Sequence, residues 1–244
     1  MFKHKGKTRT IAHNLKIASL LSFVAGIVNV AGFLSVQRLT TNVTGHFAFL
    51  VEDVNKLNFW GAFVFLLYIL FFFIGSFISS LVVEIMIIKN ERYIYVVPVI
   101  LELIILSILP FFGTTLIIHN PDIIAYSLLF AMGLQNSMVT SISNAVVRTT
   151  HLTGLFTDLG IELSQLFFYK TKEQKHKLLG SVRLRFRIIF FFFIGGIISG
   201  YLYTQVQLWV LLLAAATLLF GLIYDSIKIR LILLKRKLSS EPVR

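Results

Sequence analysis

A six-residue signature that occurs twice constrains the fold of this chain more than any other feature. Residues 40–45 have the sequence Thr-Thr-Asn-Val-Thr-Gly, and residues 149–154 have the sequence Thr-Thr-His-Leu-Thr-Gly. Two further segments recur around these copies: Gly-x-x-Asn upstream (26–29 and 133–136) and Phe-Phe-Phe-Ile-Gly downstream (71–75 and 191–195). The three anchors keep the same order, which indicates that the chain is a duplicated unit.

The composition is typical of a membrane protein. Hydrophobic residues make up 57% of the 244 positions and charged residues only 14%, whereas charged residues make up about a quarter of a soluble domain. The length has room for about six spans of about 20 residues each, and for no separate soluble domain. The absence of cysteine excludes disulfides, thiolate metal sites and a cysteine nucleophile.

Long hydrophobic runs predict six membrane crossings. They lie near Ile17–Ser35, Trp60–Ile88, Tyr93–Phe112, Ile123–Val147, Ile188–Tyr203 and Leu208–Ile227. Six crossings put both termini on one side, and every Lys and Arg except Arg38 and Lys56 then falls on that side, including the amino-terminal group Lys3, Lys5, Lys7 and Arg9. By the positive-inside rule, we expect both termini to be cytoplasmic.

The positive charges flank hydrophobic spans instead of lining a polar face. This placement indicates contacts with anionic lipids of the inner leaflet and argues against binding of nucleic acid.

The predicted topology places the two signatures on opposite sides of the membrane. The first follows crossing one and faces outward, and the second follows crossing four and faces inward. The expected fold is therefore an all-α membrane protein, one domain over 1–244, built from two inverted three-helix repeats at about 14–118 and about 121–238. Proteins with such repeats commonly hold a site at the repeat interface near the middle of the bilayer.

Each Thr-Gly pair precedes a moderately hydrophobic segment, at 46–56 and 155–169. Threonine is expected to cap the helix that follows, and glycine permits close approach of backbone or ligand. A half-helix that begins inside the membrane would direct its free N–H groups at an anion or a polar solute. The alternative is a surface loop followed by a helix that lies in the membrane interface.

Charged residues recur near both signatures. Asp53 and Glu162 each follow the signature glycine by eight residues, and Asp158 shares a helical face with Glu162. These carboxylates are candidates for proton uptake or cation binding, or they form a solvated polar face. Arg38 and Arg148 precede the signatures and are candidates to pair with these acids or to bind an anionic group. Arg148 is alternatively an ordinary charge that flanks a span on the inner side.

Polar side chains inside predicted spans supply further candidates. Asn29 and Asn136 each follow a glycine by three residues, and an amide in hydrocarbon needs a partner, so both should face the protein interior. They serve either as contacts between helices or as contacts to a solute. Glu102 is the one acid deep within a span and has no counterpart in the other repeat. Small residues are assigned to close helix packing: Gly75, Ser79, Gly195, Gly196, Ser199 and Gly200.

No catalytic or metal-binding motif occurs, and the six histidines lack the spacing of metal ligands. We therefore expect no enzyme, no metal and no cofactor.

Several segments resemble the YoaK family of bacterial six-span membrane proteins, whose function is unknown. The resemblance lies in Ala25-Gly26-x-x-Asn29 through Thr44-Gly45, and especially in 131–136 (Ala-Met-Gly-Leu-Gln-Asn), 148–154 and 157–162 (Thr-Asp-Leu-Gly-Ile-Glu). It covers nearly the whole chain and implies a location in the bacterial cell (inner) membrane. Family members often carry an acid where Asn29 stands, so the resemblance assigns no ion-coupling role to Asn29.

These observations favour a transporter- or channel-like protein for a small polar or anionic solute. The expected site residues are Asn29, Arg38, Thr44, Gly45, Asp53, Asn136, Arg148, Thr153, Gly154, Asp158 and Glu162. The alternative is a structural or regulatory membrane protein that binds a partner protein or lipid through its Thr-Gly loops.

Overall fold

The structure is a computed structural model that describes residues 11–89, 94–169 and 171–239. Within these ranges the chain is helical and has no strand. The elements are α1 (Ile11–Val36), α2 (Thr44–Asn55), α3 (Phe59–Lys89), α4 (Val96–His119), α5 (Pro121–Ser143), α6 (Leu152–Phe168), α7 (Lys172–Val206), the short 3₁₀ helix η3 (Gln207–Val210) and α8 (Leu211–Ser239). The basic group Lys3, Lys5, Lys7 and Arg9, and the expected start of crossing three at Tyr93, lie outside the described residues.

Five segments of the described chain are long and hydrophobic enough to cross a membrane. They are Asn14–Val36, Phe59–Lys89, Val96–His119, Pro121–Ser143 and Lys172–Tyr224. The last has 53 residues and contains α7, η3 and the beginning of α8. The all-helical fold is thus confirmed, whereas the division into six crossings and the inversion of the repeats stay predictions.

Helices from the first half of the sequence pack against helices from the second half. Helix α1 packs along α7, and α3 packs along α5, so the first helix of each half lies against a helix of the other half. Both contacts involve glycines at matching positions. A Cβ atom on Gly26 would overlap the carbonyl oxygen of Phe192, and one on Gly133 would overlap that of Phe72. Backbones meet at these points, which requires glycine.

A second glycine lies at each of these two helix crossings, on the partner helix. Gly195 lies against the carbonyl of Phe23, and Gly75 lies against the carbonyl of Phe130. Close packing by the predicted small residues is thereby confirmed at Gly75 and Gly195. A hydroxyl adds a hydrogen bond at each crossing: Ser199 Oγ donates to the Ile27 carbonyl at 2.9 Å and Ser76 Oγ to the Gly133 carbonyl at 3.2 Å.

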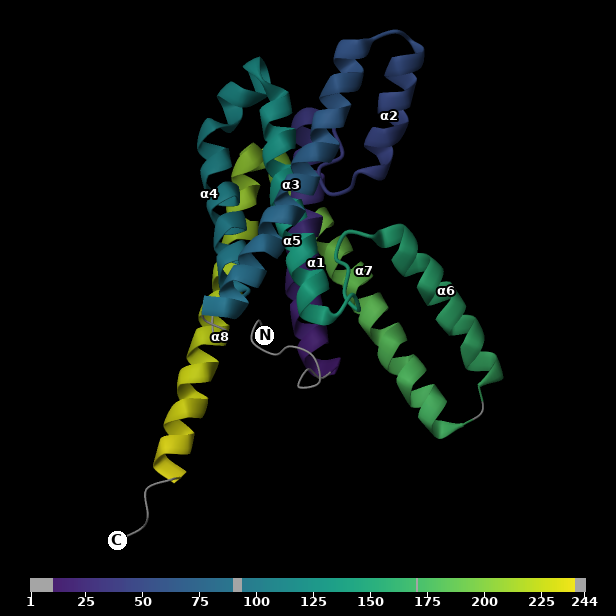
Figure 1. The fold of residues 1–244 in the computed structure, drawn as a ribbon, viewed down its shortest axis with the longest axis vertical. Helices are drawn as coiled ribbons and strands as arrows, with labels where there is room; N and C mark the ends of the chain where they lie inside the picture. Colours follow the sequence, from purple (N-terminus) through teal and green to yellow (C-terminus); the bar gives the residue numbers. More distant parts are fainter. Residues whose placement is uncertain (1–10, 90–93, 170, 240–244) are drawn as a thin grey trace.

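The chain turns back into the molecule after α1 and again after α5. Figure 1 shows that α2 runs toward the upper end of the molecule, while α6 runs toward the lower end. The two turns begin alike, because Gln37 and Asn144 have left-handed backbones with φ of 52° and 53°. Both are non-glycine residues in a conformation that asparagine tolerates best.

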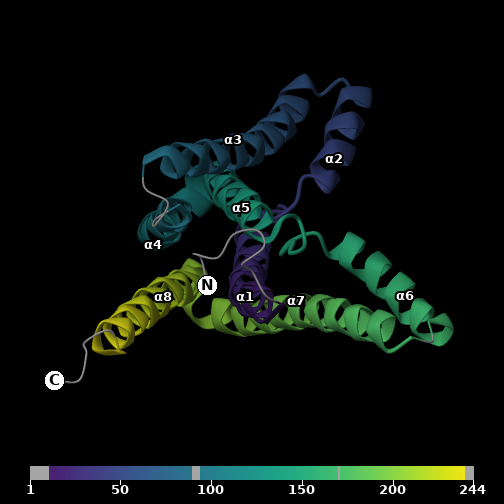
Figure 2. The same ribbon diagram turned by 60° about the horizontal axis from the view of Figure 1, so that its bottom comes forward.

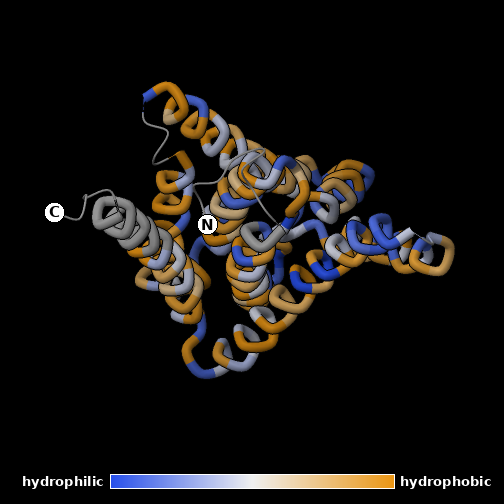
Figure 3. The backbone as a smooth tube through the Cα atoms, turned by 90° about the horizontal axis from the view of Figure 1, so that it is seen from below, coloured by the Kyte–Doolittle hydropathy of each residue, from blue (hydrophilic) through white to orange (hydrophobic). Residues whose placement is uncertain are grey.

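Figure 2 shows α1 and α5 at the centre of the bundle, with α2 and α6 splayed away from it. The central helices supply most of the fully buried side chains, including Ile27, Val28, Leu128 and Met132. Hydrophobic residues recur along the long helices (Figure 3), and many of their side chains are exposed. Phe73 and Phe77 of α3 and Phe193 of α7 are more than half exposed, which suits a hydrocarbon surrounding.

Candidate functional site: a polar pocket between the two signatures

Both signatures line one pocket. It has a volume of about 220 Å³, and the segments that follow α1 and α5 face each other across it. The lining residues are Thr41, Asn42, Val43, Thr44, Phe72, Asn136, Thr140, Arg148, Thr150 and His151. The signatures are therefore together in space although 109 positions separate them in the sequence. We call this space the central pocket.

The second threonine of each signature is tied to the asparagine of the preceding helix. Thr41 Oγ1 donates to Asn29 Oδ1 at 2.7 Å. In the other copy, Asn136 Nδ2 donates to Thr150 Oγ1 at 2.7 Å, and the Thr150 hydroxyl lies 3.0 Å from Asn136 Oδ1. Both asparagines are partly buried and hydrogen-bonded within the protein. The repeated Gly-x-x-Asn segment thus positions each returning loop against its own helix.

The first threonine of each signature is buried. Thr40 Oγ1 donates to the Val28 carbonyl at 3.2 Å. Gln135 Nε2 donates to Thr149 Oγ1 at 3.1 Å and also to the Leu21 carbonyl of α1 at 3.2 Å. A buried polar group without a partner costs about 1–3 kcal/mol, so these bonds account for threonine at both positions.

The expected capping by the third threonine is wrong. The residues that precede the first turns are Val43 for α2 and His151 for α6, and neither helix has a side-chain cap. Thr44 and Thr153 already belong to the first helical turns, where a side chain lies beside the helix and cannot reach the orphan N–H groups from in front. Within the described residues, those N–H groups therefore have no capping side chain at either helix start.

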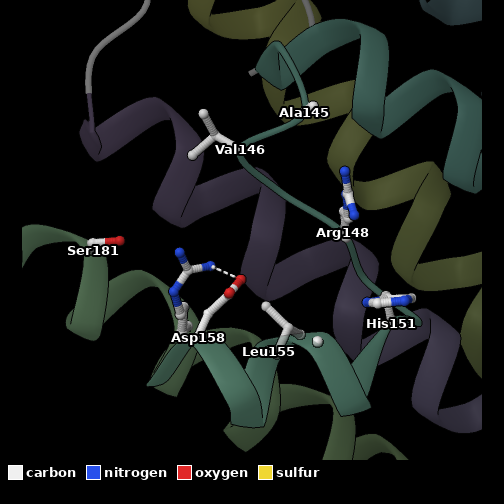
Figure 4. Close-up of a pocket in the computed structure, with 9 residues that line it drawn as sticks. Ala145, Val146, Arg148, His151, Leu155, Asp158 and Ser181 are labelled. Carbon is white, nitrogen blue, oxygen red and sulfur yellow. Dashed lines mark ion pairs between the residues drawn. The ribbon is translucent and has the colours of Figure 1, made fainter. Parts of the chain in front are cut away.

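A larger pocket adjoins the central pocket beside α6 and α7. It has a volume of about 450 Å³ and is lined by Ala145, Val146, Arg148, His151, Gly154, Leu155, Asp158, Ser181 and Arg185. Figure 4 shows Arg148 and His151 on the loop that leads to α6, with Asp158 across from them. Arg148 and His151 line both pockets, so they form the partition between them. We call this second space the α6–α7 vestibule.

The acids of α6 pair with α7 and not with Arg148. Arg185 contacts Asp158 at 3.1 Å and Glu162 at 2.8 Å, and Ser181 Oγ donates to Glu162 at 2.6 Å. The shared helical face expected for Asp158 and Glu162 is confirmed by this common partner. Arg148 has no ion pair among the described residues.

The first-half residues Arg38 and Asp53 lie away from the central pocket. Arg38 donates to the Gln37 carbonyl at 3.4 Å, and its guanidinium lies over the ring of Phe65 at 5.6 Å. Asp53 lies beside Gly61 at the turn between α2 and α3. Of the expected site residues, Thr44, Asn136 and Arg148 line the central pocket, and Gly154, Asp158 and Arg148 line the vestibule. Six line neither pocket: Asn29, Arg38, Gly45, Asp53, Thr153 and Glu162.

The helix pairs α2–α3 and α6–α7 each form an outer hairpin, and equivalent positions of the two hairpins carry different side chains. Asp53 lies beside Gly61 in the first hairpin, and at the equivalent positions of the second hairpin Glu162 lies beside Ser181. One turn away, Phe49 stacks on Phe65 at 5.3 Å in the α2–α3 hairpin. The corresponding positions of the α6–α7 hairpin carry the Asp158–Arg185 ion pair. The first hairpin is thus held by aromatic contacts and the second by charges.

His46 belongs to a buried cluster that the sequence did not predict. Its imidazole is fully buried, Nε2 donates to the Leu39 carbonyl at 2.6 Å, and the ring lies 4.8 Å from that of Tyr68. The Tyr68 hydroxyl in turn donates to Asp122 of α5. Burial lowers the pKa of His46. The one sequence signal for this cluster is the position of His46 directly after the signature glycine, because Tyr68 and Asp122 are distant in sequence.

Comparisons with known proteins found a family model and a relative that match most of the chain. A family model described as "Protein of unknown function (DUF1275)" matches residues 17–224. The chain belongs to this family. It is 28% identical over 192 residues to the UPF0700 transmembrane protein YoaK of Bacillus subtilis (strain 168), a match that covers 77% of this chain and 83% of the relative. No solved structure matches the fold at a significant level.

The family assignment confirms the resemblance to YoaK proteins noted in the sequence. The matched relative is a transmembrane protein, and this chain has several long hydrophobic helices of its own. The chain is therefore membrane-bound.

Proposed function

We propose that this protein is transporter- or channel-like and that it conducts a small anionic solute through the central pocket. The observation that supports this most directly is the composition of the pocket wall. Arg148 is the one charged residue among its described lining residues, and the others are hydroxyl, amide, imidazole and hydrophobic side chains. A pocket with one cation and no carboxylate favours an anion over a cation.

The starts of α2 and α6 add to the preference for an anion. Thr44 in the first turn of α2 and His151 at the start of α6 both line the pocket. The uncapped N–H groups and the positive dipole ends at these helix starts favour negative charge. Half-helices that begin within the membrane at corresponding positions of two repeats form the solute sites of several transporter folds.

The vestibule supplies a route to the pocket. Arg148 and His151 separate the two spaces, so an anion that enters beside α6 meets the Arg148 guanidinium before it reaches the central pocket. Asp158 and Glu162 both pair with Arg185, and this pairing offsets their negative charge. The two acids therefore repel an entering anion less than unpaired carboxylates would. In this proposal the acids position α6 and do not bind the solute.

The proposed setting is the bacterial inner membrane, with six crossings, two inverted three-helix repeats and both termini in the cytoplasm. The opposite directions of α2 and α6 in Figure 1 support the inversion. In this orientation the vestibule opens toward the cytoplasm.

Reconstituted liposomes test the proposal. The probes are gradients of chloride, nitrate, acetate and inorganic phosphate, with influx followed by light scattering or an internal indicator. We expect at least one anion to cross faster than in protein-free liposomes, and Arg148→Gln to slow it by about tenfold or more, because the site loses its one cation. Arg183→Gln is the matched control, since Arg183 is exposed on α7 and lines neither pocket.

An equal loss in both variants, or no protein-dependent flux with any of the four anions, would contradict the proposal. The second outcome would favour the alternative role, a structural or regulatory protein that binds a partner or lipid through the Thr-Gly loops.

A further inference from the structure

A groove on the outside of the bundle lies apart from the central pocket and the vestibule. It has a volume of about 410 Å³ and lies between α1, α7 and α8. Its lining residues are Lys16, Ser19, Leu20, Phe23, Arg187, Phe191, Thr217 and Phe220. The four α1 residues recur at the spacing of one helical face, so the groove follows the helix axis.

The groove is cationic at one end and hydrophobic along the rest. Lys16 and Arg187 mark the cationic end, and the Lys16 ammonium lies 5.7 Å from the ring centre of Tyr224. One turn further along α1, Leu20 faces Gly221 of α8, where a Cβ atom would crowd it. Lys16 and Phe23 are seven residues apart, which corresponds to about 10 Å along a helix.

The other polar groups of the groove are already hydrogen-bonded to their own helices. Ser19 Oγ donates to the Leu15 carbonyl and Thr217 Oγ1 to the Leu213 carbonyl, each at 2.8 Å. Within the described part of the chain, no carboxylate forms an ion pair with Lys16 or Arg187. Among the described residues, the charge that the groove presents to a ligand is therefore positive.

We propose that this groove binds one anionic phospholipid from the membrane. Its phosphate contacts Lys16 and Arg187, and an acyl chain lies along Leu20, Phe23 and Phe220. Basic pockets between membrane helices hold anionic headgroups, and each cation near the surface contributes to the attraction. Phe220 is 67% exposed, so the hydrophobic part of the groove is open to an acyl chain. The proposal does not depend on anion transport.

The test measures lipid binding to the full-length protein in a neutral detergent, by native mass spectrometry and by thermal stabilisation. Phosphatidylglycerol is the anionic probe, phosphatidylcholine the neutral probe, and inorganic phosphate the soluble competitor. We expect the wild type to bind phosphatidylglycerol about tenfold more tightly than phosphatidylcholine. The double variant Lys16→Gln/Arg187→Gln should abolish that preference.

The double variant Lys172→Gln/Arg183→Gln is the matched control, because it removes one Lys and one Arg that are exposed on α7 outside the groove. It should keep the wild-type preference. If the first double variant does not fold, Lys16→Gln alone suffices, since Lys16 is exposed and its loss leaves the packed core intact.

Three results would overturn the proposal. They are equal affinities of the wild type for the two lipids, an equal loss of preference in the groove and control variants, and full displacement of phosphatidylglycerol by inorganic phosphate.

Discussion

Single residues of the signature act mainly by holding the returning loops. The Thr41 hydroxyl can donate to Asn29 Oδ1 and the Thr150 hydroxyl to Asn136 Oδ1, and this pairing explains why the threonine and the asparagine recur together. Each bond ties the returning loop to a partly buried amide of the preceding helix.

Thr150→Val is therefore expected to destabilise the protein by about 1–2 kcal/mol, because Asn136 loses the closer of its two hydroxyl partners and keeps only Thr149 Oγ1 at 3.5 Å, while the side-chain volume at position 150 stays the same. Thr153→Val is the control, since Thr153 is exposed and its hydroxyl has no hydrogen bond among the described residues. Thermal unfolding in detergent measures the difference. Equal stabilities of the two variants would show that the Asn136–Thr150 bond contributes nothing.

For Glu102 we expect a substitution to stabilise the protein. Its side chain is fully buried in α4, and neither carboxyl oxygen has a hydrogen-bond partner within the described residues. Glu102→Leu removes this unpaired polar group at similar volume, so we expect the melting temperature to rise. Anion flux should be unchanged, because Glu102 lines neither pocket. Loss of flux in a folded variant would assign Glu102 a functional role.

The sequence was informative about which residues matter and less so about what each one contacts. Asn29 and Asn136 were expected to face the interior and they do, but their partners were not predictable because an amide in a helix has many potential acceptors. Capping by Thr44 was wrong because the helix starts at Thr44 itself. The left-handed Gln37 was not predicted, since glycine and asparagine signal that conformation in a sequence and glutamine does not.

At the scale of helices, the repeated glycines hold the two halves together. Gly26 and Gly133 occupy equivalent crossings, one between α1 and α7 and the other between α5 and α3. The stability of the protein therefore depends on contacts between segments that are far apart in sequence.

Gly133→Ala is expected to destabilise the protein by about 2–3 kcal/mol, because the new methyl group meets the backbone carbonyl of Phe72 and the helices must separate. Gly160→Ala on α6 is the matched control. Nothing lies within 4 Å of its Cβ position, so it should raise stability by up to about 1 kcal/mol through helix propensity. A destabilisation of similar size in both variants would show that the crossing is loosely packed.

The two outer hairpins should respond differently to salt. The Asp158–Arg185 pair between α6 and α7 is partly exposed and is screened at about 1 M salt, where the Debye length is about 3 Å. The Phe49–Phe65 contact between α2 and α3 carries no charge. Hydrogen exchange should therefore accelerate in α6 at high salt and stay constant in α2. Equal acceleration in both helices would contradict the charged basis of the α6–α7 contact.

The hydrophobic runs predicted the cores of the long helices but missed some ends. Crossing four was expected to reach Val147, whereas α5 ends at Ser143, because the left-handed Asn144 begins the return loop. The expected start at Ile188 missed the first sixteen residues of α7. Those residues are rich in Lys and Arg, so hydropathy hides them, and their helix becomes evident only from the packing against α6.

At the scale of the whole molecule, the central claim is that two opposed halves bring their Thr-Gly segments to one pocket. The shared pocket supports it, as do the matching glycine crossings and the opposite directions of α2 and α6 (Figure 1). Neither half is complete alone, because the first helix of each packs on the other half.

Cysteine accessibility tests this claim most directly, because the chain has no native cysteine. Lys56→Cys marks the end of α2 and Lys172→Cys marks the start of α7 just after α6, and both positions are exposed. A membrane-impermeant maleimide is applied to right-side-out and to inverted vesicles. The account predicts that position 56 is labelled only from outside and position 172 only from inside. Labelling of both positions from the same side would contradict the opposed arrangement, and with it the proposed pathway.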